Sequence, residues 1–428
     1  MSARLKLMSI LCVCASITAG LRAEEAPKLV LKEGQRVAVV GDSITEQKQY
    51  SKFIELYLTA CTPQLKLHLF QFGWGGESAP GFKNRMENDL IPYKPDVVTF
   101  CYGMNDGGYR KFDDNIGNNY KSNMAAIIAR LKTLGATLIV GGPGAVDSKY
   151  FKGGAEVYND NLAHLDAIAK QLAEENGFNH ADVHNDMMTA QVAAKKVFGD
   201  DYDVGGHDGV HPGPNGHLVM AYAYLKAMGL DGNIGTITID MKGGAEASEG
   251  HKILSVANGK VEIEIESSRA PFCFTGDEKS SNGTRSILPF VPFNRDLNRF
   301  MLVVKNLDGD EARVDWGDGN SQVFSKADLE KGINLAEKYA AGNPFSAYLA
   351  KLDQAIANKE NYETSMIKQS INPFMSVARS LDNDKEVVAA LEMMKKKFFD
   401  KYEKLHDGVR ALVAPVKHTI TVTVPKAK

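Results

Sequence analysis

The chain has 428 residues, of which 44% are apolar and 24% are charged, and its formal net charge is −3. This length allows two or three domains, each with a core of its own, and the composition is that of an ordinary globular protein. The slight acidic excess argues against a nucleic-acid partner, because phosphate binding requires a surplus of Lys and Arg.

The first residues are typical of an export signal. Arg4 and Lys6 precede a short apolar run over 7–19, and the small residues that follow offer cleavage sites. We expect cleavage near Ala23, with Gly20 as the alternative. An uncleaved anchor is disfavoured, because the run is shorter than the roughly 20 residues of a spanning helix. The mature protein is therefore expected to be secreted or periplasmic, with no stable insertion in a membrane.

Short apolar runs alternate with helical periodicity from 36 to 232, which is the pattern of an α/β domain with a parallel sheet. Strands are predicted at 37–40, 65–72, 96–101, 137–140 and 179–183. Helices are predicted at 122–134 and 154–176, and a third begins near Pro214.

Polar and apolar residues alternate over 235–325, which predicts antiparallel strands with one solvated face. Asn258-Gly259 and Asp318-Gly319 predict hairpin turns between them. Residues 326–410 have helical periodicity, and a last strand is predicted at 418–424, where it could pair with the earlier strands. The predicted organisation is a leader over 1–23, an α/β domain over 28–234 and a C-terminal region over 235–428.

One helix of the C-terminal region carries an apolar stripe at helical spacing. We interpret this stripe as core rather than as a ligand site. It comprises Val387, Val388, Leu391, Met394, Phe398, Tyr402 and Leu405.

Four short motifs contain residues with catalytic potential. They are Gly41-Asp42-Ser43, Gly76-Glu77-Ser78, Gly103-Met104-Asn105-Asp106 and Asp208-Gly209-Val210-His211. Each motif alone is common in surface turns. Three of them, however, follow successive predicted strands, and open α/β sheets bind their ligands at the carboxyl ends of strands. The four motifs together therefore predict one site.

This combination resembles the SGNH (GDSL-like) hydrolases, whose sequence blocks are marked by Ser, Gly, Asn and His. The matching positions here are Ser43, Gly76, Asn105 and His211, and the resemblance covers about 35–230. It implies a flavodoxin-like three-layer α/β domain with strand order 2-1-3-4-5. It also implies hydrolysis of carboxylic esters without a cofactor.

The residue types suit that chemistry. Ser43 is the expected nucleophile, His211 the base that activates it, and Asp208 the acid that orients the imidazole. The oxyanion of the tetrahedral intermediate requires fixed donors. We assign these to the backbone N–H groups of Ser43 and Gly76 and to the side-chain amide of Asn105. A glycine at position 76 also avoids a side chain that would crowd the oxyanion.

Neighbouring polar residues are interpreted as structural. Asp42 is expected to support the turn around Ser43, and Asp106 to organise its own loop. His207 and His217 could form a zinc site with the Asp and His of the fourth motif. Their spacing matches no metal motif, and two of the ligands already belong to the triad, so no metal is expected.

The favoured hypothesis is an exported carbohydrate O-acetyl esterase that acts on a small-molecule or polysaccharide ester. It depends on the leader and on the absence of an extended apolar segment that could form a lipid-binding lid. A lipase or lysophospholipase and an arylesterase are the enzymatic alternatives, and an inactive carbohydrate-binding homologue is the non-enzymatic one. We interpret 235–428 as a packing partner that shapes the substrate cleft; the alternative is a carbohydrate-binding accessory.

Overall fold

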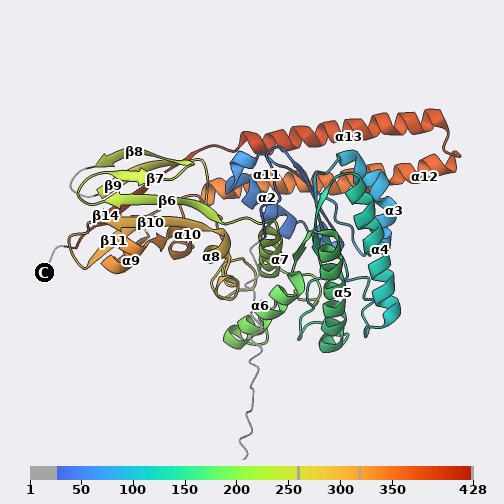
Figure 1. The fold of residues 1–428 in the computed structure, drawn as a ribbon, viewed down its shortest axis with the longest axis horizontal. Coiled ribbons are helices and arrows are strands. Elements are labelled where there is room, and N and C mark those ends of the chain that lie inside the picture. Colours follow the sequence, from blue (N-terminus) through green and yellow to red (C-terminus); the bar gives the residue numbers. More distant parts are fainter. Residues whose placement is uncertain (1–26, 258–260, 318–319, 426–428) are drawn as a thin grey trace, which may run out of the picture.

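The computed structural model describes residues 27–257, 261–317 and 320–425. The predicted leader and the predicted turns at 258–259 and 318–319 fall wholly or largely outside the described residues. Figure 1 shows three parts: an α/β domain, a β-rich region at the other end of the molecule, and a long helical hairpin that runs across the α/β domain.

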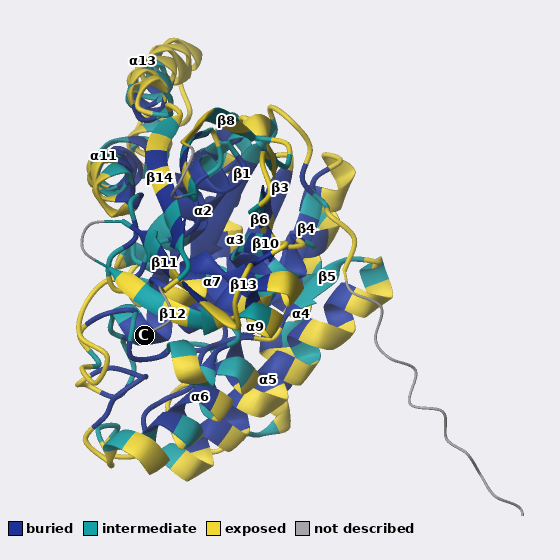
Figure 2. Ribbon diagram, turned by 90° about the vertical axis from the view of Figure 1, so that its left-hand side faces the viewer, coloured by how far each residue is buried: buried dark blue, intermediate teal, exposed yellow. Residues whose placement is uncertain are grey.

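The α/β domain is built on a parallel five-stranded sheet. Its strands are β1 (Arg36–Gly41), β2 (His68–Gln71), β3 (Val97–Cys101), β4 (Thr137–Gly141) and β5 (Asn179–Ala181). The sheet order is β2-β1-β3-β4-β5, which confirms the predicted order and fold class. Strands β1 and β3 are buried along most of their length, as expected of a parallel sheet with helices on both faces (Figure 2).

Helices cover both faces of this sheet and complete three layers. They are α2 (Tyr50–Ala60), α3 (Ala79–Asp89), α4 (Asp114–Thr133), α5 (Ala155–Asn176), α6 (Val183–Phe198) and α7 (Pro214–Ala227). Val37 and Val39 of β1 belong to a core cluster with residues of α2, α6 and α7. Ala38 and Val40 belong to another with residues of α3, α4 and α5. The period of two along β1 thus separates two apolar cores.

Helix α4 begins earlier than its sequence pattern predicts. Asp113 caps it by accepting a hydrogen bond from the Ile116 N–H at 3.0 Å. The first turns contain several polar residues, so the apolar periodicity becomes clear only from Met124 onward. The cap, rather than the apolar stripe, fixes where this helix starts.

The β-rich region consists of two sheets that face each other. One contains β6 (Asn233–Asp240), β7 (Ala245–Ala247), β10 (Arg299–Lys305) and β13 (Ile333–Asn334). The other contains β8 (His251–Ala257), β9 (Val261–Ser267), β11 (Glu311–Trp316), β12 (Ser321–Ser325) and β14 (Val416–Thr423). Phe300 of the first sheet contacts Trp316 and His418 of the second, which places an aromatic core between them.

The prediction of antiparallel strands is wrong for one pair in this region. Strand β6 pairs in parallel with β10, although the other pairs among the described strands of the two sheets are antiparallel. Alternation of polar and apolar residues reports that one face of a strand is buried, and it carries no information on the direction of the neighbour. Strand β14 returns from the C-terminal helices and lies between β9 and β11.

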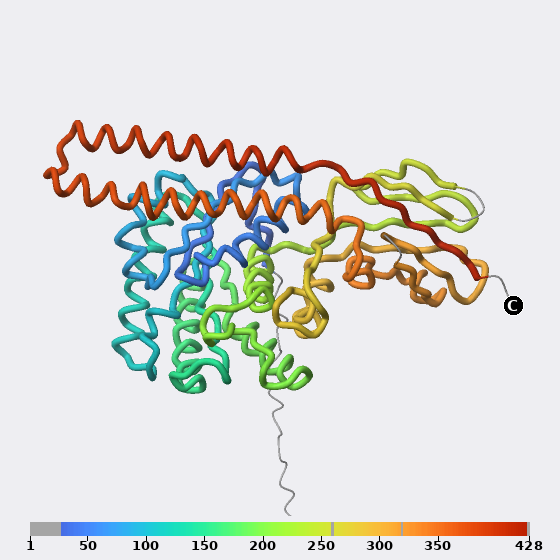
Figure 3. The backbone as a smooth tube through the Cα atoms, turned by 180° about the vertical axis from the view of Figure 1, so that it is seen from behind, coloured from blue at the N-terminus to red at the C-terminus, as the bar shows by residue number. Residues whose placement is uncertain are grey.

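The helical hairpin follows the short helices α9 (Lys326–Lys331) and α10 (Leu335–Lys338). It comprises α11 (Ser346–Ser365), a π-helical segment (Met366–Ile371), α12 (Asn372–Ser380) and α13 (Lys385–Ala411). Figure 3 shows the hairpin in orange and red along the blue N-terminal segments. The core on the α3–α5 face of the sheet also includes Met366, Ile371 and Tyr402. The C-terminal region therefore shares a hydrophobic core with the α/β domain, although the predicted boundary lies between 234 and 235.

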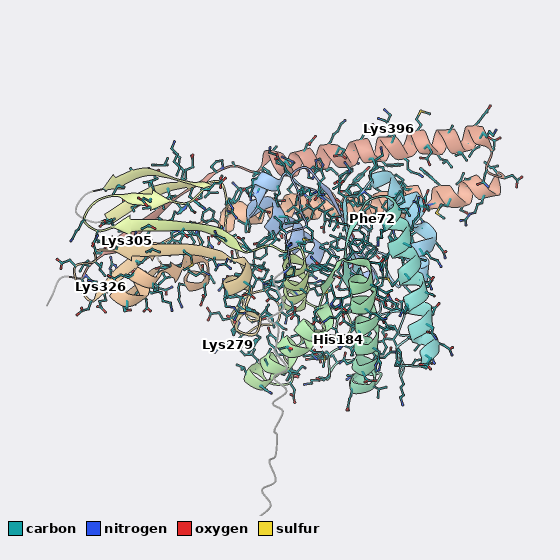
Figure 4. The ribbon with its side chains drawn as sticks, in the orientation of Figure 1. Phe72, His184, Lys279, Lys305, Lys326 and Lys396 are labelled. Carbon is teal, nitrogen blue, oxygen red and sulfur yellow. The ribbon has the colours of Figure 1, made fainter. Side chains whose placement is uncertain are left out.

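The apolar stripe of α13 is only partly core, contrary to the prediction. Tyr402 is fully buried, whereas 36% of Val388 and 47% of Met394 are exposed. The first half of α13 projects with α12 beyond the α/β domain, and Lys396 points away from the body in Figure 4, while Phe72 lies among packed side chains. Two helices alone offer too little surface to bury such a stripe.

Helices α11 and α13 cover the outer edge of β2. The carbonyl of Leu69 accepts hydrogen bonds from Lys359 Nζ and the Tyr402 hydroxyl, both at 2.8 Å. The N–H of Gln71 donates to Glu363 Oε2 at 3.0 Å. These side chains satisfy backbone groups that an edge strand would otherwise leave buried without partners.

Lys359 is fully buried among carboxyl groups at this edge. Its Nζ contacts Glu363 and lies 3.0 Å from Glu55 Oε2, and nearby Glu360 accepts a hydrogen bond from Ser51. Burial raises the pKa of Glu55 to about 7, and it also raises the pKa values of Glu360 and Glu363. Lys359 therefore balances the negative charge that remains on this cluster at neutral pH.

Candidate active site

Three loops meet at the carboxyl ends of the central strands. Strand β1 ends at Gly41, and Asp42 and the short helix α1 (Ser43–Glu46) follow at once. Because β1 lies between β2 and β3, the loops that follow these two strands flank Ser43 on either side. They carry Gly76 and Asn105, as the sequence predicts.

The structure brings Ser43, His211 and Asp208 together. Ser43 Oγ lies 2.8 Å from His211 Nε2, and His211 Nδ1 lies 2.6 Å from Asp208 Oδ2. The side chains of His211 and Asp208 are 34% and 56% exposed, so this row of groups opens to solvent. The arrangement has the connectivity of a nucleophile, a base and an orienting acid.

Asp208 is held as an anion by its own turn. Its Oδ1 accepts hydrogen bonds from the N–H groups of Val210 and His211, each at 2.8 Å. Partial burial would raise the pKa of Asp208, but these two bonds and the His211 ring outweigh burial and hold its pKa below the ordinary value. A carboxylate is therefore available to stabilise an imidazolium on His211.

Asp42 supports the turn of Ser43, as predicted. The carboxylate caps α1 by accepting a hydrogen bond from the Ile44 N–H at 2.9 Å. Complete burial, together with the nearby Asp106 and Glu77, raises the pKa of Asp42 to about 7, although the hydrogen bond from the Ile44 N–H lowers it. Asp42 thus fixes the backbone beside the serine and has no contact with His211 that would give it a role in the triad.

Asp106 joins two of the loops, as predicted. Its Oδ1 accepts from the Ala79 N–H and its Oδ2 accepts from the Gly103 N–H, each at 3.0 Å. The first donor follows β2 and the second follows β3. Burial raises the pKa of Asp106 to about 6, although these hydrogen bonds lower it. This carboxyl group therefore sets the spacing between the loops of Gly76 and Asn105.

The predicted oxyanion donors have free hydrogens. Among the described residues, the N–H groups of Ser43 and Gly76 donate to no protein acceptor. Asn105 Nδ2 donates to the Glu77 carbonyl at 2.9 Å, and its second hydrogen has only a long contact of 3.5 Å with Asp42 Oδ2. This second hydrogen is only weakly engaged in the free protein and is available to an oxyanion placed beside it.

The backbone gives a reason of its own for glycine at position 76. A β-carbon at Gly76 would meet no protein atom within 4 Å, so no neighbour in the free protein excludes a side chain. Its φ is +72°, a conformation that side-chain-bearing residues rarely adopt. The left-handed backbone is what requires the glycine, and the space beside it is open to a ligand.

Sequence reasoning missed Tyr109. Its hydroxyl donates to Asn105 Oδ1 at 3.0 Å. This hydrogen bond fixes the orientation of the amide, so that the Nδ2 group points to the acceptors described above. The ring is 42% exposed and stacks on Phe151 and Tyr158, and its φ is +56°. Only the pair Gly107-Gly108 before it signals an unusual turn, and that signal does not identify the tyrosine.

Glu77 and Arg85 also support the site and were not predicted. Arg85 donates to both carboxylate oxygens of Glu77 at 2.7 Å, and the Tyr102 hydroxyl donates to the same carboxylate at 2.6 Å. This bidentate pair is buried and orients Glu77. The backbone carbonyl of Glu77 accepts the hydrogen bond from Asn105 Nδ2.

The two further histidines near the fourth motif have other partners. His217 Nε2 lies 2.7 Å from Gln47 Oε1, and complete burial lowers the pKa of His217 to about 3. His207 is largely exposed, and its Nδ1 lies 3.4 Å from an oxygen of Asp203. Across the described residues, no group of three or more His, Cys, Asp or Glu side chains is arranged to hold a metal ion.

The chain is similar to known proteins in its sequence and in its fold. Residues 39–219 match the model of the GDSL-like lipase/acylhydrolase family. An acetylxylan esterase of Geobacillus stearothermophilus is 24% identical over 223 residues, which cover 46% of this chain and 95% of that protein. The solved structure of a gut microbial diltiazem-metabolizing enzyme is 23% identical, with a TM-score of 0.73 over 93% of this chain and all of its own.

The last similarity extends over all three parts of the molecule, so the β-rich region and the helical hairpin belong to a fold that another protein shares. The family match lies within the α/β domain and spans the strands and loops that carry Ser43, Gly76 and Asn105, as well as His211. The α/β domain of this chain belongs to the SGNH (GDSL-like) superfamily, and the chain is a carboxylic ester hydrolase.

Proposed function

We propose that this protein is an exported serine esterase that removes acetyl groups from carbohydrate. The catalytic part of this proposal rests on two hydrogen bonds that link Ser43, His211 and Asp208. They measure 2.8 Å between Ser43 and His211 and 2.6 Å between His211 and Asp208. Export depends on the leader predicted over 1–23. In the described part of the chain, no helix is long and apolar enough to cross a membrane.

The arrangement of Ser43, His211 and Asp208 supports ester hydrolysis through an acyl-enzyme. Ser43 Oγ attacks the ester carbonyl carbon while His211 Nε2 takes the serine proton. The tetrahedral intermediate collapses, the alcohol leaves with the proton from His211, and the acetyl group stays on Ser43. Water then attacks this acyl-enzyme with His211 again as base, and acetate is released. Throughout, the Asp208 carboxylate stabilises the charged imidazole.

Two features support carbohydrate as the alcohol. The curated relative from Geobacillus stearothermophilus is an acetylxylan esterase. In addition, the half-exposed ring of Tyr109 lies beside Asn105 and offers a flat apolar face to a sugar ring. The open rim formed by His211 and Asp208 gives a bulky alcohol access to the serine.

A small-molecule ester is the second candidate substrate, and the shared fold with a diltiazem-metabolizing enzyme is the observation that favours it. Assays should compare acetylated xylan and acetylated xylo-oligosaccharides with diltiazem and with p-nitrophenyl esters of two to twelve acyl carbons. We expect the highest kcat/KM on the acetylated carbohydrates and a steep fall with acyl length. A preference for long acyl chains would refute the carbohydrate proposal in favour of a lipase.

Asn105→Ala is expected to lower kcat on p-nitrophenyl acetate by about 10²- to 10³-fold with little change in KM. The amide would donate to the oxyanion, which exists only in the transition state and the intermediate. Asn105→Asp keeps the shape of the side chain but places an anion there, so its loss should be at least as large. If either variant retained the parent kcat, Asn105 would not be an oxyanion donor.

A further inference from the structure

The loop after β2 is held at two N–H groups that precede Gly76. The Gly73 N–H donates to Gln71 Oε1 at 3.0 Å, and the Gly75 N–H donates to Glu46 Oε2. The loop also passes close over α1, since a β-carbon at Gly73 would lie 2.3 Å from the Glu46 nitrogen. The direction of the next N–H, that of Gly76, therefore depends on Gln71 and Glu46.

Both acceptors are in turn supported by the C-terminal helices. Gln71 Nε2 donates to the Glu360 carbonyl at 3.3 Å and to Thr364 Oγ1 at 2.5 Å, both on α11. Glu46 Oε1 accepts from Lys368 Nζ at 2.7 Å. Lys368 belongs to the π-helical segment Met366–Ile371, a type of irregularity that is frequent at functional sites.

Lys368 also touches the loop directly. Its Nζ lies 4.9 Å from the centre of the Trp74 ring, and the guanidinium of Arg85 lies 5.1 Å from the same centre. The side chains of Lys368 and Glu46 are 29% and 24% exposed, so their ion pair is partly shielded from water. The cation thus restrains the loop both through Glu46 and through Trp74.

We propose that Lys368 is a positioning residue for ester hydrolysis, which makes the helical hairpin part of the catalytic apparatus. Lys368 holds Glu46, Glu46 holds the Gly75 N–H, and the Gly76 N–H is thereby aimed at the oxyanion. This inference rests on the proposed role of Gly76. A donor displaced by a fraction of an ångström loses much of its value, because the oxyanion hole acts through preorganised geometry.

The test compares single-site variants on p-nitrophenyl acetate. Lys368→Met should lower kcat about tenfold or more while KM changes less than twofold, and Lys368→Arg should restore most of the loss. Lys401→Met is the matched control: this exposed lysine also lies over a ring of the hairpin, 4.5 Å from the centre of Tyr362, but has no contact with the loop. Its kcat should equal that of the parent.

Glu46→Gln provides an independent second variant, should Lys368→Met fold poorly. It should lower kcat like Lys368→Met, and the double variant should show little further loss, because the two residues act in one chain of contacts. Unchanged denaturation midpoints would separate positioning from stability. The inference is wrong if Glu46→Gln or folded Lys368→Met keeps the parent kcat, or if only KM rises. If Asn105→Ala and Ser43→Ala are also fully active, the proposed function itself fails.

Discussion

Replacing Ser43 with alanine is expected to lower kcat on acetyl esters by about 10⁶-fold. The variant lacks the hydroxyl that forms the acyl-enzyme, and only the oxyanion donors and substrate binding would remain. His211→Ala should cost about as much, since without a base at 2.8 Å the hydroxyl is a poor nucleophile. The double variant should be no slower than either single one, because the two groups act as a unit.

The measurement is kcat on p-nitrophenyl acetate and on acetylated xylo-oligosaccharide, with circular dichroism to verify folding. Ser122→Ala is a suitable control, because Ser122 lies exposed on α4 and its hydroxyl bonds only to the Asn119 carbonyl. It should retain the parent kcat. A folded Ser43→Ala protein that retained turnover within tenfold of the parent on both substrates would contradict the triad.

Replacing Lys359 with methionine is expected to lower the free energy of unfolding by about 3–5 kcal/mol at pH 7.5. The substitution leaves buried Glu55 and Glu363 without their cation and removes a donor from the Leu69 carbonyl. Urea titration of the parent and the variant measures the difference. Lys52→Met is the control, because Lys52 joins the same two helices through Asp353 but is partly exposed, and it should cost at most about 1 kcal/mol.

The penalty should depend on pH with a definite sign. The pKa of Glu55 is already raised to about 7 by burial, and without Lys359 it rises further. A carboxyl group with a raised pKa in the folded state favours folding at low pH and loses that contribution as pH rises through its pKa. The Lys359→Met penalty should therefore be smaller at pH 5.5 than at pH 7.5. An equal penalty at both values would show that charge in this cluster is not its cause.

The α/β domain was predictable because its signals are local. Buried parallel strands give short apolar runs, and each of three motifs follows such a run. The strand order implied by the resemblance to the SGNH hydrolases then places these motifs next to one another. The structural roles of Asp42 and Asp106 also followed from the sequence, since short acidic side chains beside glycine commonly bond to nearby backbone N–H groups.

The contribution of the C-terminal helices was not predictable from sequence. Lys359, Glu360 and Glu363 have the spacing of a solvated, charged helix face, yet all three are buried against α2 and β2. Their partners lie about 290 residues earlier in the chain, as with Lys359 and Leu69. The contact of Lys368 with Glu46 likewise joins residues that are far apart in the sequence. The periodicity of a helix predicts which of its faces is buried, but it does not predict which distant surface that face contacts.

Covalent trapping of the nucleophile tests the central claim most directly. The full-length protein would be incubated with a fluorophosphonate, digested, and searched by mass spectrometry for the modified peptide. We expect one adduct, on Ser43, formed in step with the loss of esterase activity and strongly slowed in His211→Ala. An adduct on another serine that accompanies inactivation, or full activity of protein modified at Ser43, would contradict the account.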